Sequence, residues 1–337
     1  MRNDGSPAPP PGAPETTAAP RVSIGLPVYN GERFLAGAIA SILAQTYTDF
    51  ELIICDNAST DGTGEICRGF ASRDPRVRYH RQPRNLGATR NFNHCFELAS
   101  GEYFKWAADD DALEPRFLEA CVAALDNDPG AVLSQSLVKV VDEADRLVEI
   151  YDHSAYGTSS PRPAERLSGR LRGTCLEVFG VIRSEVLRDS ALIQSYIGSD
   201  RALLVDLALR GRFALVPEPL FINRDHLGRC TRITRARGDR RHIIAWYDTQ
   251  LSYQRVLSTW QFHLACLRLI GRHVHSPGER LRCYRKLLAS VRPRTAAYLA
   301  LEPLMLVSPH ALTLARMIKR AIRRVGGRGR SRLPGSA

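Results

Sequence analysis

The sequence of 337 residues predicts an α/β fold, in which a mostly parallel sheet is flanked by helices and followed by a C-terminal helical extension. Two observations predict it. Short apolar runs alternate with longer segments whose apolar residues have helical spacing, and polar residues directly follow several of the apolar runs. Such alternation is typical of βαβ units with right-handed crossovers. Hydrophobic residues make up 44% of the chain, enough to bury a sizeable core.

The elements follow in order from residue 21. Apolar runs predict strands over residues 22–28, 50–55, 77–80, 103–107 and 214–222. Helical spacing or capping residues predict helices over 34–45, from 60–62 to 70, 88–98, 115–125 and 202–209. Pro115 suits a first helical turn, and Gly211 suits position C′ after the last of these helices.

Composition divides the chain into three parts. Residues 1–20 are rich in proline and predict a disordered leader, residues 21–235 predict the main domain (21–127 and 128–235 as its halves), and residues 236–337 predict a basic helical extension with a disordered end. The net charge is +12, but residues from Gln261 onward contain 16 Lys or Arg and only two Asp or Glu. The basicity therefore belongs to the tail, which excludes reading the whole chain as a nucleic-acid binder. Lone cysteines and the lack of a signal peptide predict a cytoplasmic location.

Polar side chains follow three of the predicted strands. They are Asn30, Asp56 with Asn57, and the triplet Asp109-Asp110-Asp111. In open α/β sheets ligands bind outside the carboxyl ends of the strands, so these residues predict one shared crevice.

The aspartate triplet needs partners. Two carboxylates about 4 Å apart repel by about 4 kcal/mol at an effective dielectric constant near 20. Solvent, basic side chains or a divalent cation can relieve this repulsion, and carboxylate oxygens suit Mg²⁺ or Mn²⁺. The alternative is a solvated acidic turn that caps the next helix.

Five segments resemble family 2 glycosyltransferases, in the order and at the spacing of that family. They are residues 22–32 (VSIGLPVYNGE), residues 41–54 (SILAQTY and FELII), residues 56–63 (DNASTDGT), residues 85–91 (NLGATRN) and residues 101–104 (GEYF), which lead into the aspartates. The resemblance implies a GT-A fold with a Rossmann-like sheet. It also implies a nucleotide-sugar donor and a divalent metal, Mg²⁺ or Mn²⁺.

The resemblance also implies roles for residues of the donor half. By match, Pro27, Tyr29 and Glu32 line the nucleotide pocket, and Asp109 lies at the nucleotide-sugar. Asp56 accepts a hydrogen bond from a uracil or thymine ring, which favours a UDP- or dTDP-sugar; alternatively it bonds its own backbone. Arg90 lies near the ribose or the diphosphate.

Metal ligands are implied in two places. Asp110 aligns with the family's metal-ligand aspartate, with Asp111 beside it, although Ala108 stands where many members have Asp. His226, in the segment Arg224-Asp225-His226, is implied near the diphosphate as a metal or phosphate contact. Its alternative is an ordinary surface histidine.

The resemblance implies that Asp200 is the base that deprotonates the acceptor hydroxyl, with inversion at the anomeric carbon. Ser199 stands where the family often has Glu, and Asp200 could alternatively be the N-cap of its helix. The acceptor is expected to be a saccharide or a lipid-linked saccharide. Residues 151–172, rich in Ser, Pro, Arg and Gly, predict a mobile loop that faces it.

Basic residues within 316–332 have helical spacing and predict binding to an anionic membrane surface, peripheral on the inner face of the membrane. A solubilising tail is the alternative, and nucleic acid is disfavoured because residues 299–337 contain no aromatic residue. Two other functions stay open. A sugar-nucleotide nucleotidyltransferase is disfavoured by the single glycine of the turn at residues 29–32, and a non-catalytic nucleotide-binding or membrane-associated scaffold is the other.

Overall fold

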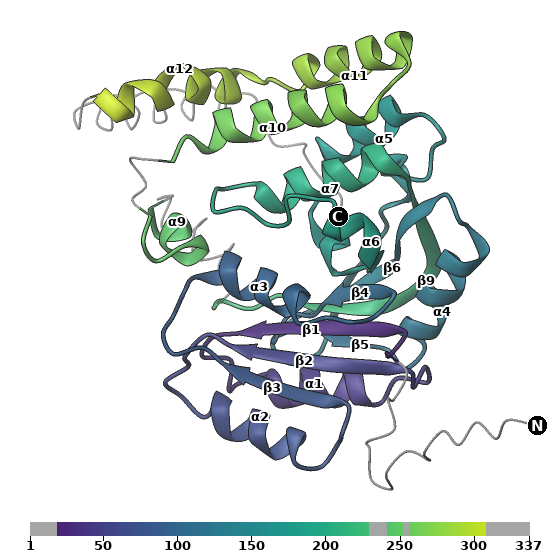
Figure 1. Ribbon diagram of the computed structural model, residues 1–337, viewed down its shortest axis with the longest axis vertical. Helices are drawn as coiled ribbons and strands as arrows, with labels where there is room; N and C mark the ends of the chain where they lie inside the picture. The colour runs from purple at the N-terminus through teal and green to yellow at the C-terminus, as the bar shows by residue number, and fades with distance from the viewer. Residues whose placement is uncertain (1–18, 229–240, 252–255, 308–337) are drawn as a thin grey trace, which may run out of the picture.

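A computed structural model describes residues 19–228, 241–251 and 256–307 (Figure 1). Most of the predicted leader and the basic segment 316–332 lie outside these residues. The described strands are β1 (Val22–Val28), β2 (Phe50–Asp56), β3 (Val77–Arg81), β4 (Tyr103–Trp106), β5 (Ala112–Leu113), β6 (Ala131–Val141), β7 (Leu147–Tyr151), β8 (Val181–Arg183) and β9 (Arg212–Arg224). The described helices are α1 (Leu35–Leu43), α2 (Thr63–Ala71), α3 (Ala88–Glu97), α4 (Phe117–Asn127), α5 (Pro163–Arg170), α6 (Ser184–Arg188), α7 (Ser199–Arg210), α9 (Arg241–Tyr247), α10 (Ser258–His273), α11 (Pro277–Ala289) and α12 (Pro293–Val307), with 3-10 turns at Ser154–Tyr156 and Leu176–Phe179.

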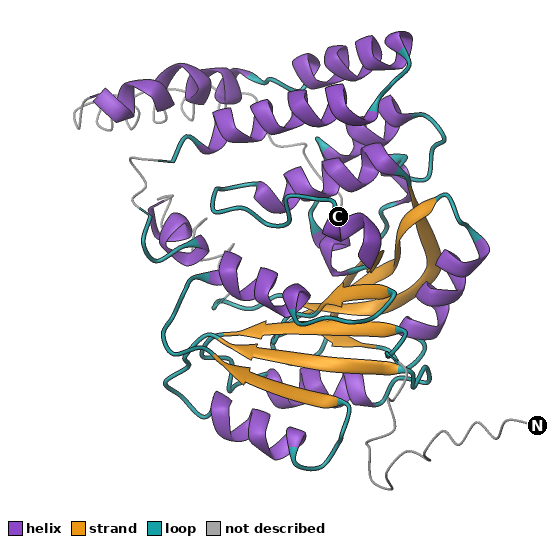
Figure 2. Ribbon diagram, viewed as in Figure 1, coloured by secondary structure: helices purple, strands orange, loops and turns teal. Residues whose placement is uncertain are grey.

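The strands form one sheet in the order β3-β2-β1-β4-β8-β6-β9-β5, and β7 pairs with β6. Strands β1 to β4 are parallel, β8 is antiparallel to both of its neighbours, and β9 runs parallel to β6. The predicted α/β fold with a mostly parallel central sheet and flanking helices is confirmed. Helices cover both faces of the sheet (Figure 2), which is why every residue of β1 and β2 is buried.

Two apolar clusters fill the space between the helices and the sheet. On one face, residues of α1 and α4 pack on β1, and on the other face residues of α3 and α7 pack on β4. The carboxyl ends of β1, β2 and β4 therefore lie at one edge of a rigid sheet, which positions the loops that follow them.

The segment 151–172 is not a mobile loop, and that prediction was wrong. Residues Ser154–Tyr156 form a 3-10 turn and Pro163–Arg170 form α5, which packs against α7 and α11. Arg166 and Arg170 are buried. Arg166 donates to the backbone oxygen of Ser160 at 2.8 Å, and Arg170 pairs with buried Glu177. The basic composition suggested exposure, but paired guanidinium groups can be buried.

The role predicted for Gly211 also differs. Its φ is −160°, an extended conformation rather than the left-handed one of a C′ glycine. Glycine is needed there because a Cβ would lie 2.4 Å from Cγ1 of Val132. Contrary to the prediction, Pro115 lies two residues before α4 rather than in its first turn, since that helix begins at Phe117.

The described part of the C-terminal extension is helical, as predicted. Helices α10 and α11 pack against α7 and α5, on the side away from β1–β3 (Figure 1). The carboxylate of Glu302 in α12 accepts hydrogen bonds from the backbone amides of Thr259 (2.9 Å) and Trp260 (3.2 Å), and so caps α10. No helix within the described residues is long and apolar enough to span a membrane.

Candidate active site

The turn after β1 lies between the loops that follow β2 and β4. Asn30 has a φ of 53°; its backbone amide donates to Ser59 Oγ at 2.9 Å, and its Oδ1 accepts from the Thr60 amide at 2.8 Å. On the other side a Cβ at Gly31 would lie 2.2 Å from Asp109 Oδ2, so only glycine allows this approach. The three strand-end clusters therefore pack together at one edge of the sheet, as predicted.

Asp56 is fully buried at the end of β2. Its Oδ1 accepts from the backbone amide of Ser59 at 2.7 Å, and its Oδ2 accepts from Tyr79 (2.7 Å) and Arg81 (2.6 Å). Burial opposes ionisation, but these hydrogen bonds together hold the pKa of Asp56 below its usual value. Asp56 is thus an ionised group that bonds its own loop, as the alternative reading expected, and its predicted contact with a nucleobase stays a prediction.

The carboxylates of the aspartate triplet contact two parts of the chain: Asp110 contacts His226, and Asp111 contacts the end of β9. Burial and the charges of Asp110 and Asp111 raise the pKa of Asp109 to about 7. Asp110 Oδ2 lies 2.9 Å from Nε2 of His226, so the structure brings these two predicted ligands together.

Asp111 is buried and connects the triplet to the end of β9. Its carboxylate accepts from the amide side chain of Asn223 (3.0 Å) and from the backbone amide of Arg224 (2.9 Å). Arg224 Nε donates in turn to the backbone oxygen of Asp110 at 3.1 Å. The end of β9 therefore fixes the loop that carries the triplet and places His226 beside it.

The other residues predicted for the nucleotide pocket surround the β1 turn. Pro27 is buried in β1, whereas 47% of Tyr29 is exposed. The Glu32 carboxylate accepts from the amide of Gly62 at 2.6 Å, at the start of α2. Arg90 is exposed in the first turn of α3, and its contact with the ribose or the diphosphate stays a prediction.

Asp200 is half-buried in the first turn of α7, where its Oδ1 accepts from the next backbone amide at 2.8 Å. The N-cap is Gly198, so Asp200 is not that cap. Burial and the charge of Asp200 both raise the pKa of Tyr247 in α9, and Ile244 of α9 packs in one buried cluster with Ala202 of α7. The backbone of Tyr247 also contacts Gly87 at the start of α3, since a Cβ on Gly87 would lie 2.6 Å from its oxygen. Helix α9 thus joins the start of α7 to the start of α3.

Sequence reasoning missed the partners of the acidic groups. Tyr79 and Arg81 hold Asp56, and Asn223 and Arg224 hold Asp111. The pairing of Tyr79 and Arg81 with one carboxylate was predictable in part, because residues two apart in a strand point to the same face of the sheet. The second pair was not predictable in this way, since it lies more than a hundred positions from the triplet.

No three His, Cys, Asp or Glu side chains within the described ranges gather closely enough to hold a metal ion by themselves. Mg²⁺ commonly takes only one or two carboxylates and receives other ligands from substrate phosphates and water. Asp110 with His226, beside Asp109, is a set that suits such an ion.

Residues 23–187 match the family model described as "Glycosyl transferase family 2". Among the curated relatives, the putative glycosyltransferase EpsE of Bacillus subtilis is 41% identical over 110 residues, 32% of this chain and 40% of EpsE. Glycosyltransferase GlyG of Streptococcus pneumoniae is 37% identical over 98 residues, 29% of this chain and 33% of GlyG. The matched segment thus spans well under half of either relative.

Among solved structures, residues 1–349 of TarS from S. aureus in complex with UDP-GlcNAc give a TM-score of 0.54 at 14% identity, covering 93% of both chains. At that identity the likeness concerns the fold, which is of the GT-A type.

Proposed function

We propose, from the premise that residues 23–187 are a family 2 glycosyltransferase domain, that the protein transfers a single sugar from a nucleoside-diphosphate sugar to a hydroxyl group. The acceptor is a saccharide or a lipid-linked saccharide, and the anomeric carbon is inverted. The observation that carries the proposal is the packing of the Asp56 loop and the aspartate triplet on two sides of the β1 turn, with His226 against Asp110. This arrangement gives a donor one edge of the sheet on which to bind.

The donor's nucleotide is proposed to lie over the β1 turn. Asp56 is proposed to accept an N–H from a uracil or thymine ring; because its carboxylate is fully buried and has three donors, one of these donors has to move to admit the base. Pro27, Tyr29 and Glu32 line the pocket, and Arg90 reaches the ribose or diphosphate. The TarS structure that shares the fold contains UDP-GlcNAc, which supports a UDP- or dTDP-sugar.

A divalent ion, Mg²⁺ or Mn²⁺, is proposed to be held by Asp110 and His226, with Asp109 at the nucleotide-sugar. The residues fit such an ion, because they combine carboxylate oxygens with an imidazole nitrogen. When bound, the ion supplies positive charge to the leaving diphosphate. Asp111, predicted as a further ligand, is bonded to β9, and these bonds favour a role in positioning Asp110.

Asp200 is proposed as the general base. Its carboxylate takes the proton of the acceptor hydroxyl while that oxygen forms a bond to the anomeric carbon. The bond from this carbon to the diphosphate oxygen breaks, and its electron pair leaves with the nucleoside diphosphate. The acceptor attacks from the face opposite the leaving group, so the anomeric configuration is inverted.

The test of the donor site is release of UDP from UDP-sugars in the presence of Mn²⁺. We expect slow release by the wild-type protein and loss of it in Asp110→Ala. Asp189→Ala is the matched control, because 75% of the Asp189 side chain is exposed. A nucleotidyltransferase would instead release pyrophosphate when given a nucleoside triphosphate and a sugar phosphate. A scaffold would bind UDP but would release no UDP from UDP-sugars.

The test of the base is Asp200→Asn, which keeps the shape of the side chain. We expect it to bind UDP normally and to transfer sugar about 10²–10⁴ times more slowly. Transfer at the wild-type rate would remove Asp200 from this role.

We also propose that the protein works in the cytoplasm, on the inner face of the membrane. Helix α10 supports this, because Trp260, Leu264 and Leu267 are 37%, 38% and 43% exposed and recur with helical spacing. The double substitution of Leu264 and Leu267 by Ser should lower partition onto vesicles that contain anionic lipid. Equal partition of both proteins would contradict this location.

A further inference from the structure

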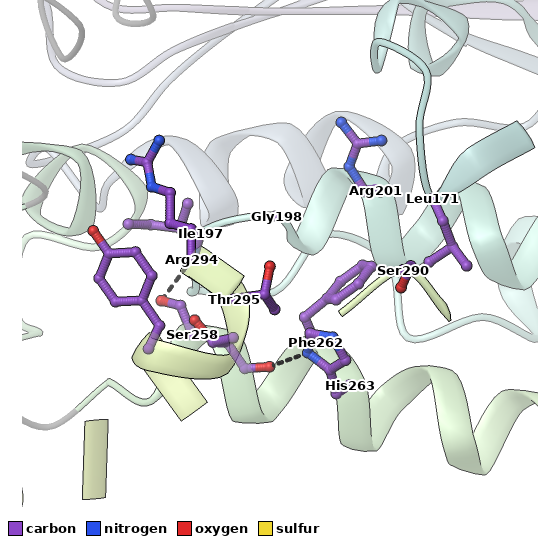
Figure 3. A pocket seen from close by; sticks show the side chains of 12 residues that line it. Leu171, Ile197, Gly198, Arg201, Ser258, Phe262, His263, Ser290, Arg294 and Thr295 are labelled. Carbon is purple, nitrogen blue, oxygen red and sulfur yellow. Dashed lines mark hydrogen bonds between the residues drawn. The ribbon is translucent and has the colours of Figure 1, made fainter. Parts of the chain in front are cut away.

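A cavity of about 310 Å³ lies between α7 and the helices of the C-terminal extension (Figure 3). Its wall includes Gly198 before α7, Ser258 at the start of α10, and Thr295 near the start of α12. The volume is at the lower end of the range for small-molecule sites, which is about 300–1,000 Å³. Leu171 lies within the segment that matches the family, and the other lining residues follow residue 187, so most of the cavity lies outside that segment.

The lining of the cavity is basic. It includes Arg201, Arg294 and His263, and none of its residues is Asp or Glu. The imidazole Nδ1 of His263 lies 2.7 Å from the backbone oxygen of Thr259 and must donate to it, so Nε2 of the neutral ring is an acceptor that can take a hydrogen bond from a hydroxyl of the ligand. The nearby carboxylate of Glu302 is outside the lining and is already bonded to the start of α10.

The two arginines approach from different elements. Arg201, in α7, is fixed because its Nη1 donates to the backbone oxygens of Arg170 and Gly173, both at 2.7 Å, and its other nitrogens carry further donors. Arg294, in α12, lies over the ring of Tyr298, 6.0 Å from its centroid. Figure 3 shows the two guanidinium groups apart from each other, both above the other lining side chains. Two separate guanidinium groups suit a phosphate, because each can donate to a different oxygen of the same group.

The cavity is also next to the proposed base. Gly198 and Arg201 line it, and Asp200 lies between them in the first turn of α7. The rings of Phe262 and Tyr298 add apolar surface on which a sugar can pack. A ligand here would contact the helical turn that carries the proposed base, whereas Asp200 itself is not among the lining residues.

We propose that this cavity binds a phosphate group carried by the acceptor. The proposal rests on the proposed function and deepens it, because it assigns the acceptor to phosphorylated saccharides. The C-terminal extension, rather than the family 2 domain alone, then selects the acceptor.

The experiment uses the full chain and inorganic phosphate as the probe. The unfolding temperature is followed during titration with phosphate at constant ionic strength, with acetate in parallel. We expect a saturable rise with phosphate and none with acetate. In Arg294→Gln the apparent affinity should fall on the order of tenfold, as expected for loss of a charge-assisted bond, and Arg294→Lys should restore part of it.

Arg285→Gln is the matched control, because Arg285 is an exposed arginine of α11 outside the cavity. It should respond to phosphate as the wild-type protein does. An equal response of Arg294→Gln, an equal response to acetate, or no saturable response in the wild-type protein would each overturn the proposal.

Phosphate could also bind where the donor's diphosphate binds, so Asp110→Ala is titrated as well. A phosphate response that is unchanged in Asp110→Ala and weakened in Arg294→Gln assigns phosphate binding to the cavity. Binding of UDP with Mn²⁺ to the wild-type protein is measured separately. Failure of the wild-type protein to bind UDP counts against the proposed function alone, whereas absence of a phosphate response in the wild-type protein counts against the cavity alone.

A phosphate group could reach the cavity on a soluble saccharide or on a lipid. Vesicles with and without phosphatidic acid distinguish the two sources. If Arg294→Gln partitions more weakly than the wild-type protein onto phosphatidic acid vesicles, the cavity binds the phosphate of a lipid-linked acceptor. If partition is unchanged while the response of Arg294→Gln to phosphate is weakened, the cavity binds the phosphate of a soluble acceptor.

Discussion

Lys105 provides the sharpest test of how the sheet is packed behind the donor site. Its side chain is fully buried in β4, and its ammonium donates to the backbone oxygens of Phe179 (2.7 Å) and Trp106 (3.0 Å). The rings of Phe117 and Phe221 lie 4.9 and 5.4 Å from its nitrogen. Burial lowers the pKa of Lys105 to about 8. We predict that this buried cation makes the stability of the protein rise with pH.

The magnitude follows from proton linkage. In the unfolded chain the same lysine titrates near about 10.4, so between about pH 8 and 10.4 the unfolded state binds more protons than the folded state. The free energy of unfolding therefore rises with pH across this window, by about 2 kcal/mol between about pH 7 and 9.5. Asp111 and Cys121 are the titratable groups that act on Lys105. Both favour its charged form, but they raise its pKa by less than burial lowers it.

The assay is urea unfolding, followed by tryptophan fluorescence, at several pH values in this range. Lys105→Met keeps the length and apolar stem of the side chain and removes the titrating group. The stability of the wild-type protein relative to Lys105→Met should increase by about 2 kcal/mol as the pH rises. Lys286→Met, at an exposed position of α11, is the control and should follow the wild-type profile. Parallel profiles for the wild-type protein and Lys105→Met would refute the reasoning.

Three further predictions concern single contacts. Gly31→Ala should abolish UDP binding measured by calorimetry, because its Cβ would lie 2.2 Å from a carboxylate oxygen of the aspartate triplet. Gly37→Ala is the control and should bind UDP normally, because a Cβ there meets nothing within 4 Å. Normal binding by both variants would contradict the argument. Arg81→Met removes a 2.6 Å ion pair that lowers the pKa of Asp56, so acid unfolding should begin at a higher pH than in the wild-type protein; an unmoved acid midpoint would count against this. Glu302→Gln should weaken the cap of α10, lower the free energy of unfolding by about 1 kcal/mol and speed proteolysis within α12; an unchanged cleavage rate would show that α12 is held otherwise.

The donor side of the site could be predicted from the sequence because its residues come directly after strands. All seven residues of β1 and of β2 are buried, so each apolar run marks a strand and the next polar residues mark its end. Asn30, Asp56 and the aspartate triplet are found by this rule alone. Their neighbourhood then follows from the order of parallel strands, since β2, β1 and β4 are adjacent.

The other partners of these residues could not be predicted from the local pattern, because they come from distant segments. Asn223 and Arg224 lie 112 and 113 positions from Asp111, and the placement of His226, 116 positions from Asp110, is predicted only through the family resemblance. Composition was misleading at α5, where buried arginines are paired with backbone oxygens and with Glu177. Pairing of this kind depends on the fold and leaves no pattern in the local sequence.

The match to the family model ends at residue 187, before α7 and β9 begin. These two elements are consecutive: α7 carries Asp200 in its first turn, and β9 ends beside Asp111 and His226 after pairing with β6 along its length. One continuous helix and strand therefore connect the proposed base to the donor-side aspartates, while the start of that helix also forms a wall of the basic cavity. Because the packed sheet fixes the end of β9, a group bound in the cavity would be held at a set distance from the donor. The relatives therefore constrain the donor half, and the acceptor has to be inferred from the chemistry of α7 and the extension.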